Sequence, residues 1–239
     1  MASTPRILSG LSNHESSAVR LAATVALRRL KSPAVSTFVQ DADPQVADEA
    51  IRAICDLDMV SRRPLVADQL DDLTRRPWTP FMLRRLIHNA FRIGTPEDAT
   101  RLLKLTLDPT IPEIVQKEAL RLVAHWTEPF PVDQFTGIWR PLEKRSLTTI
   151  KPALLAAMPE LLKRENFVLT AALQLVKHYQ LDLPALDDSA LRSLIQNAKL
   201  PTEARTAALD RLIAQSSGGE RPKRKWWDAM ADADDETES

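Results

Sequence analysis

Histidine and cysteine are the side chains best suited to metal binding and acid–base catalysis, and they are scattered along this chain. The histidines are His14, His88, His125 and His178, and Cys55 is the single cysteine. Metal ligation or proton transfer needs such groups clustered at one site. The sequence also contains no HExxH, GxSxG or glycine-rich phosphate motif. We therefore predict no enzyme, with no catalytic residue, no metal site and no cofactor site.

Cys55 is the only thiol, so an internal disulfide, a thiolate zinc cluster and a Cys-x-x-Cys motif are excluded. It stands late in an alanine-rich helical stretch. We interpret it as a small buried residue of the core.

A set of polar residues recurs two, six and ten positions after the start of each internal repeat. In stacked helix pairs such positions form a polar strip along one surface, often the surface that binds partners. Two interpretations stay open: the strip is the solvated side of amphipathic helices, or it is a specific binding face. His125 and His178 share a register position, which leaves a shared ligand as a further alternative. The candidate partner-binding face is Asp48, Arg52, Arg85, Asn89, Lys117, Arg121, His125, Gln174 and His178.

Trp226 and Trp227 form a tandem aromatic pair inside "KRKWWDAM", next to basic residues. Exposed aromatic side chains with basic neighbours suit docking to a partner or to an anionic surface. The alternatives are the remnant of a linker of a longer protein and a tail without a selected function. We treat the pair as a candidate docking tail within a disordered, charged segment at 216–239.

The elements that position these residues repeat along the chain. Each copy has an apolar residue, a small residue four positions later and an apolar residue four positions after that. The copies are Val19-Ala23-Leu27, Val46-Ala50-Ile54, Leu83-Ile87-Phe91, Val115-Ala119-Val123, Val168-Ala172-Val176 and Ala204-Ala208-Leu212. Their average spacing is about 37 residues, which is typical of two-helix solenoid repeats.

Second helical stretches lie between these copies, and the composition favours helix over strand, with only five glycines and one tyrosine. Proline after a capping residue begins helices, because its missing N–H costs nothing at the first helical position. The five such pairs are Ser32-Pro33, Asp43-Pro44, Thr79-Pro80, Thr95-Pro96 and Asp108-Pro109. The sequence thus predicts an all-α, right-handed superhelix of five or six helix pairs.

The longest interval between copies contains an irregular insertion near 127–146, which prolines and Gly137 keep from forming a long helix. Its Phe130, Phe135, Ile138 and Trp139 are too apolar to be left in solvent. We expect it to be ordered, with Trp126 and Trp139 packing it onto the repeats. The predicted organisation is a flexible N-terminus at 1–16 and one repeat domain with a continuous core at 17–215.

Charge and hydropathy limit the partners. Lys plus Arg and Asp plus Glu balance at 32 each, which argues against nucleic acid. A weak nucleic-acid binder using Arg52, Arg85, Lys117 and Arg121 stays an alternative. No signal peptide and no apolar run of roughly 20 residues is present, so the chain as written is expected to be cytoplasmic, without a membrane span.

The repeat, with its Asp-Pro before a helix, resembles HEAT repeats of the armadillo-like class over residues 17–215. The segments "AVRLAATVALRRL", "DADPQVADEAIRAICDL", "LRRLIHNAFRIGTPEDATRL", "EALRLVAHW" and "GIWRPLEKR" resemble the HEAT segment of secreted bacterial proteins of the planctomycete type. In that family a sugar-dehydrogenase-like β-propeller precedes the repeats, and a c-type haem domain often follows them.

The resemblance implies a non-catalytic scaffold or protein-interaction module that holds a protein partner or neighbouring domains. It also implies export, in contrast to the missing signal peptide. Because the chain has no Cys-x-x-Cys-His motif and no propeller, no haem or oxidoreductase role is transferred to its residues. The alternative is a detached part of a multidomain sugar-oxidising or haem-containing electron-transfer protein.

Overall fold

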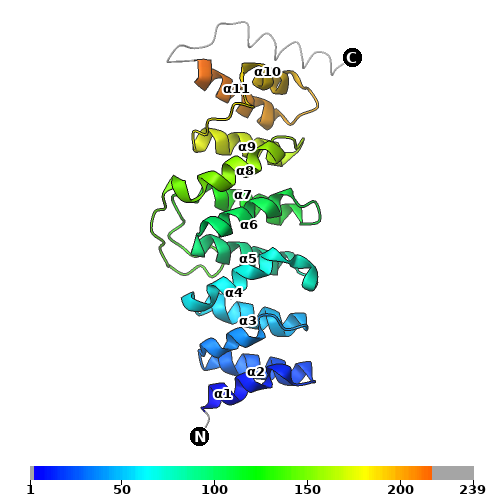
Figure 1. Ribbon diagram of the computed structural model, residues 1–239, viewed down its shortest axis with the longest axis vertical. Helices are drawn as coiled ribbons and strands as arrows, with labels where there is room; N and C mark the ends of the chain where they lie inside the picture. The colour runs from blue at the N-terminus through cyan, green and yellow to red at the C-terminus, as the bar shows by residue number, and fades with distance from the viewer. Residues whose placement is uncertain (1–2, 217–239) are drawn as a thin grey trace. The chain divides into compact units, whose positions relative to one another are not determined.

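The computed structural model describes residues 3–216, and this part of the chain is all-α (Figure 1). The helices pack in neighbouring pairs, so the predicted all-α repeat fold is confirmed. The chain divides into two compact units, Met1–Thr149 and Ile150–Ser239, here called unit 1 and unit 2. The sequence had predicted one repeat domain with a continuous core. The division falls just after the segment that interrupts the repeats.

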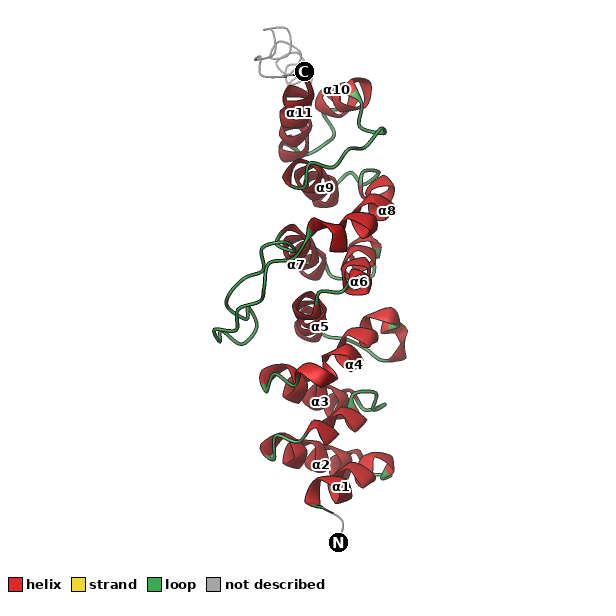
Figure 2. Ribbon diagram, turned by 60° about the vertical axis from the view of Figure 1, so that its left-hand side comes forward, coloured by secondary structure: helices red, strands yellow, loops and turns green. Residues whose placement is uncertain are grey.

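Unit 1 contains seven α-helices and six short 3-10 helices among its described residues. Helix α2 packs on α3, α4 on α5, and α5 and α6 both pack on α7 (Figure 2). The α-helices are α1 (Thr4–Ser9), α2 (Ser17–Arg29), α3 (Pro44–Asp56), α4 (Arg63–Ala67), α5 (Pro80–Ile93), α6 (Pro96–Leu107) and α7 (Glu113–Ala124). The 3-10 helices are η1 (Gly10–Asn13), η2 (Pro33–Phe38), η3 (Val60–Arg62), η4 (Asp68–Asp71), η5 (Leu73–Arg75) and η6 (Leu147–Thr149).

The described residues of unit 2 contain four helices. Helix α9 packs on α8 and on α11, and α10 packs on α11. Their bounds are α8 (Lys151–Leu161), α9 (Phe167–His178), α10 (Asp188–Gln196) and α11 (Thr202–Ser216). The candidate docking tail with Trp226 and Trp227 lies outside the described residues.

The apolar stripe of each repeat forms the core, as the spacing predicts. In α3, α5, α7, α9 and α11 every stripe residue is at most 3% exposed. In α2, Ala23 and Leu27 are buried, while Val19 is half-buried. The small residue at the centre of most stripes allows close approach of the neighbouring helix. Cys55 is buried as expected, and burial raises the pKa of its thiol to about 11.

Four of the five predicted proline starts are confirmed. The side chains of Ser32, Asp43, Thr79 and Thr95 each accept a hydrogen bond from a backbone N–H in the first turn of the following helix. Thr95 forms a complete capping box with Asp98. The fifth prediction was wrong.

Asp108 ends α6 instead of starting a helix, and Pro109 lies in a turn. The Asp108 carboxylate accepts a hydrogen bond from the Thr110 N–H at 2.8 Å, a turn geometry that competes with helix capping. Helix α7 begins only after Pro112. The same Asp-Pro pair therefore begins a helix at Asp43-Pro44 and forms a turn at Asp108-Pro109.

The N-terminus also differs from the prediction of a flexible segment. Residues 4–13 form α1 and η1. Leu8 and Leu11 pack against the apolar core that contains Leu27 and Phe38. These two leucines give the segment enough apolar contact to be ordered.

Three helices end in the same strained cap. Lys31, Asp58 and Gln180 follow α2, α3 and α9 in the left-handed region, with φ of 50°, 54° and 49°. The next N–H of each donates back to the helix, for example Ser32 to the Leu27 carbonyl at 2.9 Å and Leu181 to the Val176 carbonyl at 2.9 Å. Glycine takes this conformation without steric cost, and Gly94 does so after α5 with φ of 76°.

We expect Lys31→Gly to stabilise unit 1 and Gln180→Gly to stabilise unit 2, each by up to about 1 kcal/mol. Glycine removes the free-energy cost that other residues have in the left-handed conformation. Urea denaturation measures the change. Leu30→Gly is the control, since Leu30 is right-handed with φ of −75° and loses stability on becoming glycine. A lower midpoint for Lys31→Gly than for the parent chain would contradict the interpretation.

Candidate interaction surface

Residues 127–146, here called the strap, run across the ends of helices in unit 1 (Figures 1 and 2). Arg140 donates hydrogen bonds to the carbonyls of Cys55 at 3.3 Å and Asp56 at 2.7 Å, at the C-terminus of α3. Arg145 donates to the carbonyls of Phe91 at 2.6 Å and Arg92 at 3.4 Å, at the C-terminus of α5. The last carbonyls of a helix lack partners and carry partial negative charge. Two guanidinium groups thus fix the strap to two successive repeats.

Arg145 is also held between aromatic rings. Its guanidinium lies 5.0 Å from the ring centre of Phe91 and 4.9 Å from that of Trp126. Burial lowers the pKa of Arg145 to about 10. A Cβ atom at Gly94 would collide with this guanidinium, so glycine serves both the left-handed cap and the close approach of the strap.

The turn of the strap is organised by Asp133, which is 4% exposed. Its carboxylate accepts hydrogen bonds from the N–H groups of Phe135 at 3.0 Å and Thr136 at 3.1 Å. Arg92 and Arg140 lie 3.7 and 3.4 Å from it. Burial acts to raise the pKa of Asp133, but these hydrogen bonds and the two guanidinium groups outweigh it and hold the pKa below its usual value.

Two members of the predicted polar strip are buried, and the strap covers one of them, Arg85, which corrects the expectation of an open face. Arg85 is 5% and Asn89 2% exposed. The Arg85 guanidinium lies 4.2 Å from the ring centre of Phe135 and pairs with Asp56. Asn89 accepts a hydrogen bond from Arg63 at 3.1 Å and donates one to the Arg63 carbonyl at 2.9 Å. Both side chains therefore make contacts inside unit 1 and are not available to a partner.

The other strip residues of unit 1 stay at the surface. Asp48 is half-buried, while Arg52, Lys117 and His125 are exposed. Arg121 donates to Glu118 at 2.8 Å. The basic members that the nucleic-acid alternative invokes lie next to acids of their own helices: Arg52 lies 3.5 Å from Asp56, and Lys117 lies 2.5 Å from Glu113.

An open groove of about 420 Å³ lies where α3, α5 and the strap meet. Phe81 and Ile138 on its walls are 56% and 48% exposed. The rings of Phe81 and Phe135 meet edge to face with centres 4.9 Å apart. The lining residues are Arg52, Asp56, Phe81, Arg85, Phe135, Thr136 and Ile138. The predicted strip residues Arg52 and Arg85 therefore do border a concave surface, but three of its seven lining residues, Phe135, Thr136 and Ile138, come from the strap.

Of the two tryptophans predicted to pack the strap onto the repeats, one is buried and the other is exposed. Trp126, just before the strap, is fully buried, and its Nε1 donates to Thr149 Oγ1 at 3.2 Å. Trp139 is 68% exposed, so the expectation that it packs the strap onto the repeats was wrong. Its backbone pairs with Val132 as an isolated β-bridge. Together with Ile138, Trp139 leaves apolar surface open to solvent.

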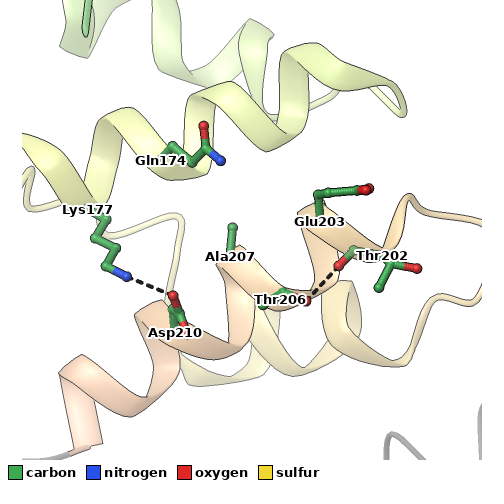
Figure 3. A pocket seen from close by; sticks show the side chains of 7 residues that line it. All are labelled: Gln174, Lys177, Thr202, Glu203, Thr206, Ala207 and Asp210. Atoms are coloured by element: carbon green, nitrogen blue, oxygen red, sulfur yellow. Dashed lines mark hydrogen bonds and ion pairs between the residues drawn. The ribbon is translucent and has the colours of Figure 1, made fainter.

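In unit 2 the strip residues Gln174 and His178 are exposed on α9. Gln174 borders a second groove of about 360 Å³ between α9 and α11. Figure 3 shows Gln174 and Lys177 on α9 and Glu203, Thr206 and Asp210 on α11; Lys177 points toward Asp210 and donates a hydrogen bond to it at 2.7 Å. This groove is lined almost entirely by polar side chains, and it lacks the exposed aromatic groups of the groove in unit 1.

A half-buried carboxylate also links α5 and α7. Glu118 lies 2.6 Å from His88 Nε2 and accepts a hydrogen bond from Arg121 at 2.8 Å. The hydrogen bond with His88, together with Arg121, holds the pKa of Glu118 far below its usual value. Because the folded-state pKa is depressed, the stabilisation is present above the unfolded value near 4.5 and is lost as the pH falls below it.

We expect the free energy of unfolding to fall between pH 6 and pH 3, and to fall less in Glu118→Gln, which has no carboxylate to protonate. Urea denaturation at each pH, followed by circular dichroism, measures this. Glu128→Gln is the control, because the Glu128–Lys144 pair is exposed to solvent and such pairs contribute little. Equal pH dependence in Glu118→Gln and the parent chain would contradict the assignment.

Comparison of the chain with protein-family models, curated proteins and solved structures gives no match. Among residues 3–216, no helix has both the length and the apolar character to cross a membrane. Within the same residues, no group of three His, Cys, Asp or Glu side chains is placed to hold a metal ion.

Proposed function

We propose that the chain is a non-catalytic scaffold of HEAT-like repeats that binds a partner protein through unit 1. One observation carries this proposal: the groove between α3, α5 and the strap exposes Phe81 and Ile138 beside Arg52. Exposed apolar side chains around a concave, polar-rimmed surface are typical of protein-binding sites. Aromatic and arginine side chains are also the groups enriched at binding hot spots.

The strap supports the proposal because it holds the groove in one form before a partner arrives. Arg140, Arg145 and Asp133 each make several contacts with helices α3 and α5 or within the strap. A preformed surface loses less conformational entropy on binding than a mobile loop does. If the resemblance to propeller-containing and haem-containing proteins extends to the role, the partner is a neighbouring domain of that kind.

The nucleic-acid alternative has less support. Arg85 is buried, and Lys117 and Arg121 pair with acids of their own helix, which leaves Arg52 as a single exposed arginine rather than part of a basic patch. Phosphate binding needs a concentrated basic surface. We therefore retain the protein-binding role alone.

A photo-cross-linking residue at position 138 tests the proposal in cells that express the chain. Ile138 is exposed beside the groove, whereas Leu30, 51% exposed at the end of α2, is the control position. We expect a discrete cross-linked protein from position 138 that position 30 does not capture. The same products from both positions, or none from position 138, would overturn the proposal.

A further inference from the structure

Building on the proposed function, we propose that the groove of unit 1 binds an acidic peptide segment that carries a large apolar anchor side chain. The segment belongs to the partner protein. The apolar anchor lies against Phe81 and Ile138. The acidic residues pair with Arg52 and with the neighbouring Arg28. Three features of the groove support this chemistry.

The first feature is an apolar wall built from two separate segments. Phe81 comes from the first turn of α5, and Phe135 and Ile138 come from the strap. The Arg85 guanidinium packs on the ring of Phe135, 4.2 Å from the ring centre, and holds it in place. A groove of about 420 Å³ lies within the roughly 300–1,000 Å³ typical of ligand sites. It has room for one large anchor side chain, and its open form admits a peptide.

The second feature is an arginine whose charge is only weakly compensated. The Arg52 side chain is 52% exposed and lies 3.5 Å from the Asp56 carboxylate. Asp56 also pairs with Arg85 and lies 3.8 Å from Arg28. One carboxylate therefore faces three guanidinium groups. Arg52 keeps donors available for a second carboxylate, and a guanidinium binds carboxylates with two parallel hydrogen bonds.

The third feature is that carboxylates near the groove are shared between guanidinium groups. Arg28 has a second acid, Glu49, at 2.9 Å, and Asp48 interacts with Arg85, whereas Arg52 has only the shared carboxylate of Asp56 as its ion-pair partner among the described residues. Next to α5, the Glu118 carboxylate is likewise shared by Arg121 at 2.8 Å and Arg84 at 3.9 Å. In both places one carboxylate is shared by two or more guanidinium groups. A partner that supplies carboxylates offers these shared guanidinium groups a further hydrogen-bond acceptor.

Binding of a synthetic peptide to the full chain tests the inference. The probe is a fluorescein-labelled peptide, GSDEEWSDEDG, in which one tryptophan is the only large apolar residue among acidic ones. Its controls replace the tryptophan by serine or every acid by lysine. We expect saturable binding of the probe by fluorescence anisotropy, weaker at high salt, and at least tenfold weaker binding of either control peptide.

Variants of the chain locate the site. We expect Ile138→Ser and Arg52→Glu each to weaken binding of the probe about tenfold or more. Leu30→Ser and Arg29→Glu, two exposed positions on or next to α2, should leave binding within about twofold of the parent chain. Circular dichroism confirms that each variant is folded, which is expected because all four side chains are exposed.

The outcomes separate the inference from the proposed function. No binding of the probe, tighter binding of the lysine peptide, or binding that Ile138→Ser and Arg52→Glu leave unchanged would each overturn the inference. If cross-linking from position 138 still captures a discrete protein in that case, the scaffold role stands and only the peptide chemistry is wrong. If cross-linking also fails, the protein-binding role falls as well.

Discussion

Replacing Ala119 by Asp is expected to abolish cooperative unfolding of unit 1. Ala119 is completely buried at the centre of the α7 stripe, where α7 meets α5 and α6. A carboxylate there has no partner and no room, and burying an unpaired charge costs more than the total stability of many domains. Thermal and urea denaturation followed by circular dichroism measure the loss.

Two matched variants make this result specific. Ala172→Asp places the same charge in the completely buried stripe of α9 and should disrupt unit 2. Ala22→Asp lies on the exposed side of α2 and should unfold almost like the parent chain. Hydrogen exchange then assigns each loss to its unit. Parent-like unfolding of Ala119→Asp would show that the stripe does not form the core of the repeat.

Replacing Trp126 by Ala should have the next largest effect. The Trp126 ring is fully buried, meets Phe91 edge to face at 5.8 Å and stacks with Arg145. Removing it leaves a cavity and frees the guanidinium that holds the strap to α5. We expect a loss of about 3–5 kcal/mol in unfolding free energy, measured by urea denaturation.

Trp139→Ala is the matched control in the same segment. Because Trp139 is 68% exposed, its removal should change the free energy of unfolding by no more than about 0.5 kcal/mol. A large loss in Trp139→Ala, or a small one in Trp126→Ala, would reverse the roles that the structure gives to the two tryptophans.

The sequence predicts the repeats well because their signal is local. The stripe residues, such as Ala119 and Ile54, recur at helical spacing, and a helix with one apolar side buries that side. Capping is also local, so Thr79 and Thr95 could be identified from the residue that follows them. The same local rule failed at Asp108, where the side chain closes a turn.

The candidate site could be predicted only in part, because it depends on contacts between distant segments. The register placed Arg52 and Arg85 on one face, and both border the groove. It could not show that Phe135 covers Arg85, which lies 50 positions earlier in the chain. The sequence does contain one signal for the contact between the strap and the helices, namely Arg140 and Arg145 in "GIWRPLEKR". Basic side chains bind favourably at helix C-termini.

Native-state hydrogen exchange of the strap tests the central claim, that the strap and helices α3 and α5 form one preformed surface. The N–H of Asp133 donates to the Ile138 carbonyl at 2.9 Å, that of Arg140 to Pro131 at 3.1 Å, and that of Arg145 to Thr127 at 3.0 Å. We predict slow exchange of these three amides, comparable to that of α5. Exchange at the rate of an unstructured peptide would contradict the claim, because the groove would then have no fixed wall.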